Sequence, residues 1–261
     1  MRRAVVIPHR VHRDLLLRAL AAVAGEDVVV VDDSDAGGLV DLLAGHPGVQ
    51  VVRTPGGSGF ARAANAGLAA VERAGFSHAV VLNDDAEPEP GCLDALAAAW
   101  TSDTGAVGPV MLGPHGVESA GLRLASWGRV RVRVEVPTDR PTVPVDALAG
   151  ACLLLESGAR FDEGYRHGME DLALCRDLRL QGRQVLLVVG ARCHHQGGAT
   201  VSRASRAAQR HGVAGHLRLV GGGVRTPIVL GLAAAQVARE RGPLDRLLGI
   251  AEGWRDFRRS R

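Results

Sequence analysis

The chain has 261 residues, of which 46% are hydrophobic, so it can bury the core of one large domain and is not a disordered protein. All 31 basic residues are arginine, only 3% of the residues are aromatic, and the net charge of +3 is small for this length. A nucleic-acid-binding surface combines clustered cations with stacking aromatic rings. The composition therefore argues against nucleic acid as a partner and suits an enzyme that attracts small anions.

The first half of the chain alternates strand-like and helix-like segments. Short runs rich in valine are followed by segments in which leucine and alanine recur at helical spacing. Continuous apolar strands that alternate with helices predict an α/β fold with a parallel sheet covered on both faces. The predicted strands are residues 4–8, 28–31, 49–53 and 78–82, and the predicted helices are residues 13–24, 39–43 and 60–74.

The second half of the chain is less regular. Valine alternates with charged residues from Val130 to Val136, which is typical of a half-exposed antiparallel strand within 121–136. We predict a proline-rich loop over 137–144, strands over 147–155 and 184–189, and a helix over 170–181 that ends before Gly182. Helical residues with a basic tail follow from Ile228. We therefore predict a main domain over 1–225 and a C-terminal helical extension over 226–261.

Polar clusters directly follow three of the predicted strands, at residues 8–10, 32–35 and 83–85. In sheets of this kind, ligands bind beyond the carboxyl ends of the strands. The pattern therefore predicts a binding site at this edge before any single motif is considered.

The tripeptide Asn83-Asp84-Asp85 is the most informative of these clusters. Carboxylates at a strand end are suitable ligands for Mg²⁺ or Mn²⁺, which prefer oxygen and bridge diphosphates. The same residues could instead form a helix N-cap ahead of Pro88-Glu89-Pro90, and the tripeptide alone does not decide between the two.

Asp32 and Asp33 have a similar ambiguity. Their carboxylates can accept hydrogen bonds from a nucleotide base or a ribose hydroxyl, or they can form an Asx turn. The glycine-rich loop 56–59 precedes a predicted helix, whose first N–H groups can bind phosphate. The loop is neither a Walker motif nor a GxGxxG fingerprint, so ordinary loop flexibility explains it equally well.

Two further pairs occur in the second half. Glu170-Asp171 begins a predicted helix, where acids favour the helix dipole but can also act as a general base aimed into a site. His194-His195 closes a predicted strand, and only one of two adjacent side chains can point into a given cleft. That histidine is either structural or a nitrogen ligand of a diphosphate-bound cation.

In this order and at these spacings, the motifs resemble glycosyltransferase family 2, especially its bacterial rhamnosyltransferase-like members. The resemblance covers roughly residues 4 to 200. It implies the GT-A fold, a mostly parallel Rossmann-like central sheet flanked by helices with a small antiparallel element on the acceptor side. The matching stretches are residues 5–8, 28–34, 59–68, 82–85 with Pro88 and Pro90-Gly91, 119–121, 150–154, 161–163, 170–171 and 195–200.

The resemblance assigns residues to the donor site. Asp32 or Asp33, preferably Asp33, would bind the nucleotide base, with Pro8 beside it. Arg62 and Asn65 would face the nucleotide from their helix.

The resemblance also implies a metal site for Mn²⁺ or Mg²⁺. Asn83-Asp84-Asp85 stands in the place of the family's D-x-D motif, with Asn83 and Asp84 on the donor and Asp85 as a metal ligand. Asparagine replaces the first acid but still offers a neutral oxygen, so metal binding would be weaker yet retained. His195 fits the family's H-x-G-G spacing better than His194 and would complete the metal shell.

Asp171 matches the second acid of the family's Glu-Asp pair and would be the catalytic base, whereas the usual third acid is Ala173 here. The implied activity is metal-dependent, inverting transfer of a hexosyl or deoxyhexosyl group from a nucleotide-diphosphate sugar to an acceptor hydroxyl. The acceptor, whether a glycan, a lipid-linked glycan or a small molecule, is left open. The departures at Asn83 and Ala173 keep a non-catalytic nucleotide-sugar-binding or scaffold protein as an alternative. A nucleotidyltransferase is another, but it would need a basic glycine-rich loop in place of residues 8–12.

The remaining features concern the compartment. Cys92, Cys152, Cys175 and Cys193 form no CxxC pair, which predicts neither a zinc site nor a disulfide framework and suits a reducing compartment. No signal peptide follows Met1 and no charge-free apolar run of about 18 residues occurs, so we predict a cytoplasmic protein. The C-terminal segment mixes an apolar stretch, 228–237, with arginines, so it either packs on the domain or makes peripheral contact with the inner membrane. These arginines are Arg239, Arg241, Arg246, Arg255, Arg258, Arg259 and Arg261.

Overall fold

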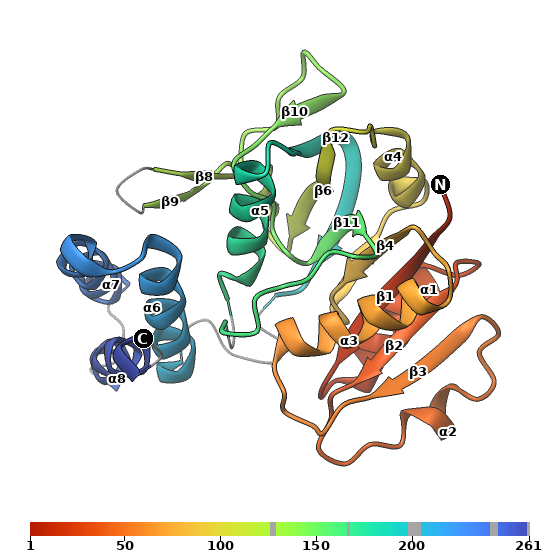
Figure 1. Cartoon of the computed structure of the whole chain (residues 1–261), viewed down its shortest axis with the longest axis horizontal. Helices are drawn as coiled ribbons and strands as arrows, with labels where there is room; N and C mark the ends of the chain where they lie inside the picture. The colour runs from red at the N-terminus through yellow and green to blue at the C-terminus, as the bar shows by residue number, and fades with distance from the viewer. Residues whose placement is uncertain (126–128, 166–167, 198–204, 241–244, 260–261) are drawn as a thin grey trace.

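The computed structural model describes residues 1–125, 129–165, 168–197, 205–240 and 245–259. Within these residues, ten strands form one mixed sheet (Figure 1). Eight of them are, in spatial order, β10 (Thr142–Pro144), β12 (Gln184–His195), β6 (Thr104–Gly113), β11 (Cys152–Glu156), β4 (His78–Leu82), β1 (Arg3–His9), β2 (Val28–Asp32) and β3 (Val49–Arg53). The two others lie off this path: β5 (Ala86–Pro88) pairs with β12, and β7 (Gly116–Ser119) pairs with β6.

The first half forms the predicted parallel sheet. Strands β3, β2, β1 and β4 are parallel neighbours, connected by α1 (Arg13–Ala22), α2 (Leu39–Leu43) and α3 (Phe60–Arg73). The second half adds β11, which is antiparallel to both β4 and β6, while β12 is parallel to β6. The predicted α/β fold with a mostly parallel, helix-flanked sheet is confirmed.

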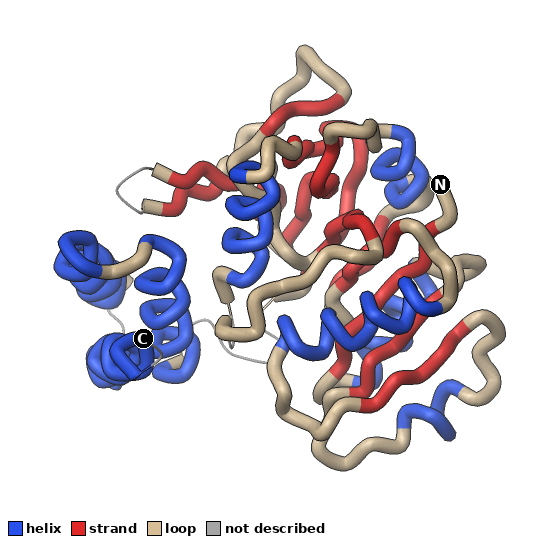
Figure 2. Tube along the Cα trace, in the orientation of Figure 1, coloured by secondary structure: helices blue, strands red, loops and turns tan. Residues whose placement is uncertain are grey.

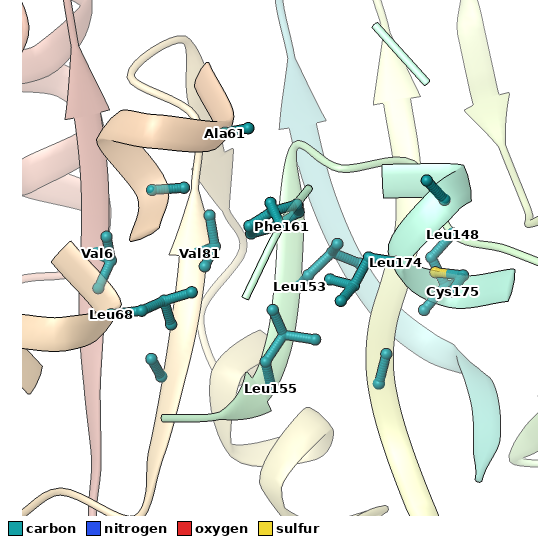
Figure 3. Packing of buried hydrophobic residues seen from close by; sticks show 14 of the residues in the cluster. Val6, Ala61, Leu68, Val81, Leu148, Leu153, Leu155, Phe161, Leu174 and Cys175 are labelled. Atoms are coloured by element: carbon teal, nitrogen blue, oxygen red, sulfur yellow. The ribbon is translucent and has the colours of Figure 1, made fainter. Parts of the chain in front are cut away.

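Helices cover both faces of the sheet (Figure 2). Successive residues of each buried strand point to opposite faces, so both faces carry apolar side chains that the helices bury. In β1, Val6 packs in the layer of Leu68 on α3, whereas Val5 packs in the layer of Leu16 on α1. Helices α3 and α5 (Glu170–Leu180) supply residues to the first layer, and α1, α2 and α4 (Cys92–Ala98) supply the second. Figure 3 shows the first layer, whose labelled residues are Val6, Ala61, Leu68, Val81, Leu148, Leu153, Leu155, Phe161, Leu174 and Cys175.

The region from 121 to 155 differs from the prediction. The alternating run forms only a short strand, β9 (Val130–Val132), paired with β8 (Leu122–Leu124). The predicted loop over 137–144 ends in β10, an edge strand, where a proline can be accommodated. The strand expected over 147–155 is observed over Cys152–Glu156, since Ala147 instead makes an isolated bridge to Leu122.

Strand β6 was not predicted because its sequence, TGAVGPVMLG, contains three glycines and Pro109 among its apolar residues. Proline cannot donate to a ladder and normally stays out of central strands. Here the partner strand accommodates it, because the pairing with β12 shifts register between Val188, opposite Pro109, and Arg192, opposite Val110. The short helix α4 and strand β7 were also missed.

Helices α7 (Thr226–Arg239) and α8 (Asp245–Arg259) lie in the segment where helical residues were predicted, whereas α6 (Arg206–Val220) was not predicted. The three helices share a small core of their own. Helix α8 lies tightly on α6, since a Cβ on Gly253 would stand 2.4 Å from the Arg210 carbonyl oxygen. Arg176 of α5 donates to the Leu219 carbonyl, which ties α6 to the sheet domain. The predicted domain boundary at 225 stays a prediction. In the described part of the chain, no helix combines the length and apolar content needed to cross a bilayer.

Candidate functional site

The carboxyl ends of β1, β2 and β4 meet at one edge of the sheet, where the sequence predicts a site. His9, the last residue of β1, accepts a hydrogen bond at its carbonyl from the Asp33 N–H (2.8 Å). Its buried ring places Nδ1 2.7 Å from Oδ2 of Asp84. The three predicted polar clusters are therefore in contact through His9, and Pro8 precedes it on the same strand, opposite Val31.

The buried carboxylate of Asp32 is held by the chain itself. Its Oδ1 accepts from the N–H and the hydroxyl of Ser34, which is the Asx turn considered from the sequence. Its Oδ2 pairs with the Arg53 guanidinium at 3.0 Å.

Asp33 is also buried, and it accepts four hydrogen bonds. The donors are the Thr54 hydroxyl (2.5 Å), the Ser58 hydroxyl and N–H (2.6 and 3.0 Å) and the Gly59 N–H (3.3 Å). Burial alone would raise the pKa of Asp33, but the bonds from Ser58 and Thr54 lower it below its usual value, so the group is an anion at neutral pH. The glycine-rich loop at the start of α3 therefore directs two N–H groups at Asp33. The assignment of Asp32 and Asp33 to base binding stays a prediction.

Arg62 and Asn65 both hold the segment that follows β11. Asn65 donates to the Phe161 carbonyl (2.9 Å) and accepts from the Phe161 N–H (2.8 Å). Arg62 Nε and Asn65 Nδ2 each donate to the Glu163 carboxylate, and these bonds lower the pKa of Glu163. The predicted contact of Arg62 and Asn65 with a nucleotide stays a prediction.

Asp85 and His195 come together because β5 pairs with the end of β12. Oδ1 of Asp85 lies 3.3 Å from Nε2 of His195, and Nδ1 of His195 lies 2.9 Å from Oε2 of Glu118. His194 points elsewhere, with its exposed ring 3.0 Å from the Glu89 carboxylate. Of the two adjacent histidines, His195 is thus the one beside Asp85.

The two carboxylates around His195 control its charge. Burial lowers the pKa of His195, but the bonds to Asp85 and Glu118 outweigh burial and raise it to about 9. The His195 contact in turn lowers the pKa of Asp85, against the effect of burial. In the absence of another cation, the imidazolium is therefore the positive charge between these two acids.

The residues at this point fit a divalent cation that a diphosphate helps to hold. Among the described residues, no group of three or more His, Cys, Asp or Glu side chains is arranged to hold a metal ion alone. Mg²⁺ sites commonly use one or two protein ligands and complete their shell with substrate phosphate oxygens. Asp85 and His195 supply such a pair, and Asn83 adds a buried Oδ1 that has no hydrogen-bond partner in the described structure.

The acid pair begins α5, as predicted, and its two side chains have different surroundings. Oδ2 of Asp171 accepts from the Gly150 N–H and Oδ1 from the Leu172 N–H, both at 2.8 Å. Burial raises the pKa of Asp171 despite these bonds. Glu170 is only 8% exposed and its Oε2 has no partner. Burial and then the charge of Asp171 raise the pKa of Glu170 to about 8, so Glu170 is largely neutral at pH 7.

Backbone links connect the acid pair to the other clusters. Gly150 precedes Ala151, whose carbonyl accepts from the Asn83 N–H at 2.9 Å. Two backbone hydrogen bonds at adjacent residues, from the Gly150 N–H to Asp171 and from the Asn83 N–H to Ala151, therefore connect the acid pair to the Asn83-Asp84-Asp85 segment. At the start of α5, Met169 adopts φ 74°, the one positive φ of a non-glycine residue in the described ranges. Such a conformation costs free energy and is concentrated at functional sites.

The model of glycosyl transferase family 2 matches residues 4–144, which is more than half of the chain. The chain belongs to this family. Solved structures with the same fold include GalNAc-T7 with UDP, GalNAc and Mn²⁺ (17% identical, TM-score 0.66, covering 85% of this chain and 48% of that one). They also include S. aureus TarS 1–349 with UDP-GlcNAc (14% identical, TM-score 0.59, covering 90% and 71%). A third is the mannosyltransferase PcManGT from Pyrobaculum calidifontis with GDP-Man and Mn²⁺ (17% identical, TM-score 0.58, covering 97% and 73%).

At these identities the likeness to solved structures concerns the fold, and it confirms the predicted GT-A architecture of this family 2 chain. The chain spans about half the length of GalNAc-T7. No curated protein matches the chain by sequence.

Three residues of this family 2 site were not predicted from the sequence. His9 and Glu118 contact predicted site residues, and Glu163 holds Arg62 and Asn65. His9 lies inside a predicted polar cluster, and Glu163 belongs to a motif that carries the family resemblance, so both had a signal. Glu118 directly precedes the Ser119-Ala120-Gly121 stretch but lies where the sequence shows no regular pattern.

Proposed function

We propose that this family 2 chain is an inverting glycosyltransferase that moves a hexosyl or deoxyhexosyl group from a nucleotide-diphosphate sugar to an acceptor hydroxyl. The observation that carries the proposal is the contact between Asp85 and His195 beyond the strand ends, in a chain of this family. The solved neighbours that bind UDP, UDP-GlcNAc or GDP-Man agree with a nucleotide-sugar donor. The rhamnosyltransferase-like subtype rests on the sequence resemblance.

Asp85 and His195 would hold Mn²⁺ or Mg²⁺ together with the donor diphosphate, and Asn83 would add a neutral oxygen. When bound, the cation supplies positive charge opposite the diphosphate that leaves the sugar. Neighbours of the same fold that contain Mn²⁺ support a divalent cation.

Asp171 would act as the general base. In the proposed step it accepts the proton of the acceptor hydroxyl while the acceptor oxygen forms a bond to the anomeric carbon. The bond from that carbon to the diphosphate oxygen breaks, and the electron pair leaves with the diphosphate. A single displacement of this kind inverts the anomeric configuration. The raised pKa of Asp171 suits a base that takes up a proton in the reaction.

Glu170 would not share this role. Its carboxyl is buried, raised in pKa to about 8 and therefore mostly protonated at neutral pH, so it is a poor proton acceptor there. Successive residues on a helix diverge by about 100°, so both acids cannot face one hydroxyl.

The test is a panel of UDP-, GDP- and dTDP-sugars, assayed for binding and for release of nucleoside diphosphate with Mn²⁺ and with Mg²⁺. We expect one class of donor to bind and to be hydrolysed slowly without acceptor. Binding of a donor with no hydrolysis and no transfer to any acceptor would favour the non-catalytic alternative. Failure of every donor to bind would refute the proposed function.

We further propose a cytoplasmic location with peripheral membrane contact through the C-terminal helices. The four free, buried cysteines suit a reducing compartment. Helices α7 and α8 expose Ile228, Leu247 and Leu248 on a module that also carries arginines, a mixture that suits an anionic lipid surface. Arg241 and Arg261 of the predicted basic set lie outside the described residues. Absence of co-sedimentation with anionic vesicles would refute the membrane contact.

A further inference from the structure

Glu118 and Asp85 lie at opposite nitrogens of the same imidazole. The Glu118 carboxylate is 2.9 Å from Nδ1 of His195, while the Asp85 carboxylate is 3.3 Å from Nε2. All three side chains are largely buried, with 24% exposure for Glu118, 14% for His195 and 8% for Asp85. Each ring nitrogen of His195 therefore faces a carboxylate, and the two contacts together fix the orientation of the ring.

The backbone at Glu118 is irregular in a way that serves this contact. In the pairing of β6 with β7, Met111 lies opposite Ser119 and Leu112 lies opposite Val117. Glu118 is therefore the extra residue of a β-bulge. Bulges turn a side chain away from the direction that a regular strand would give it, and they are enriched beside active sites.

We propose that Glu118 is a positioning residue for His195: it accepts the Nδ1 proton and thereby fixes Nε2 as the nitrogen that meets a divalent cation beside Asp85. This inference rests on the proposed function, in which Asp85 and His195 hold that cation. A neutral imidazole carries its proton on only one nitrogen, and the nitrogen without the proton is the one that can bind a metal. A carboxylate behind a metal-binding histidine fixes both the tautomer and the orientation of the ring.

Glu118 itself is not assigned as a ligand of the same ion. It contacts the ring nitrogen opposite to the one that faces Asp85, so the ring stands between the two carboxylates. This agrees with the finding that no group of three such side chains in the described residues is arranged to hold one metal ion. Its effect on the cation is therefore transmitted through His195.

The test measures Mn²⁺ binding to the full chain by electron paramagnetic resonance, alone and with UDP. Glu118→Ala should weaken Mn²⁺ affinity by about 10–100-fold, the usual effect of losing such a partner. Glu118→Gln should restore affinity close to the wild type, because the amide oxygen can still accept the Nδ1–H bond. A role in local folding alone would instead appear as altered circular dichroism and thermal unfolding, without a selective loss of Mn²⁺.

Two variants act as controls. Glu89→Gln alters the exposed carboxylate that contacts the adjacent His194, so it should leave Mn²⁺ affinity unchanged. Asp85→Ala should remove Mn²⁺ binding, which tests the proposed metal site itself. If Asp85→Ala binds Mn²⁺ like the wild type, or the wild type binds none, the proposed site is wrong and this inference fails with it. If Asp85→Ala loses Mn²⁺ while Glu118→Ala keeps it, the site stands and only the role of Glu118 is refuted.

A second measurement does not depend on a stable Glu118 variant. With ¹⁵N-labelled histidine in the Mg²⁺–UDP complex of the wild type, the His195 signals, assigned with His195→Asn, should report a proton on Nδ1. A proton on Nε2 in that complex would overturn the proposal.

Discussion

Replacing Asp171 by Asn tests the proposed base most directly. The side chain keeps its size but loses the ability to take up a proton. The new amide also has little freedom, because the side chain at position 171 packs closely on Gly150. A Cβ built on Gly150 would stand 2.9 Å from the Cβ of Asp171. Of the two backbone N–H groups that now bind the carboxylate, the amide oxygen can keep one, and its NH₂ must face the other.

These two effects have separate magnitudes. Loss of one hydrogen bond to a buried carboxylate, with a donor left facing a donor, costs about 1–3 kcal/mol of unfolding free energy. Loss of a general base lowers the rate by about 10²–10⁴-fold, which is a barrier increase of about 2.7–5.5 kcal/mol. Donor binding should change little, since Asp171 interacts with the acceptor in the proposed step.

The assay combines steady-state transfer kinetics, donor affinity and chemical unfolding of the same preparations. The matched control is Glu170→Gln, which replaces a mostly neutral carboxyl whose Oε2 has no partner and should reduce turnover much less. Near-normal turnover of Asp171→Asn together with an inactive Glu170→Gln would mean that the roles are reversed. If both variants remain active, the base lies elsewhere and the placement of the acceptor site is wrong.

Three further predictions address the cation, a titration and the packing. Excess EDTA should stop turnover and Asp85→Ala should lose donor affinity as well as rate, because the cation also holds the diphosphate in the ground state; full turnover by metal-free protein would contradict this. The pKa of Glu170 is about 8 in the folded protein against an ordinary 4.5, so between pH 4.5 and 8 the unfolded chain releases this proton and the folded chain keeps it. As pH rises through this range, Glu170 therefore lowers the unfolding free energy by up to about 1.4 kcal/mol per pH unit. The unfolding free energy of Glu170→Gln should therefore increase relative to that of the wild type from pH 5 to 8. If the difference between the two proteins does not change with pH, the raised pKa of Glu170 is refuted. Gly67→Ala should destabilise by about 1–3 kcal/mol in denaturant melts, since the new Cβ would stand 2.3 Å from Cγ1 of Val6, whereas Gly231→Ala on open helix surface should not destabilise.

The parallel half of the sheet could be predicted because each of its elements carries a local signal. Valine runs such as 28–31 end at acids, and the helix at 60–73 repeats small apolar residues on its buried side. The second half could not be predicted in the same way. Strand β6 contains Pro109, which lies where the pairing with β12 shifts register, and no local pattern in the sequence reveals that shift.

The candidate site divides along similar lines. Residues at strand ends, such as Asp33 and Asp85, were found because topology alone places them at one edge. Their actual hydrogen-bond partners depend on contacts between distant segments, which no local pattern encodes. Thr54 and Ser58 around Asp33 illustrate this, as does the bulge that turns Glu118 toward a histidine 77 positions away.

The pairing of β5 with the end of β12 has a consequence for how the protein folds. Asp85 and Gly197, which share a hydrogen bond across this pairing, are 112 positions apart in the chain. Closing so long a loop costs entropy before any contact compensates for it, and contacts of this kind form late. The parallel half of the sheet needs shorter closures, since β1–β2 and β2–β3 join strands that follow one another in the chain, and its longest closure pairs Arg3 of β1 with His78 of β4. A nascent chain that has not yet delivered β12 therefore lacks the Asp85–His195 pair, and the pair is complete only once nearly the whole sheet domain has been synthesised.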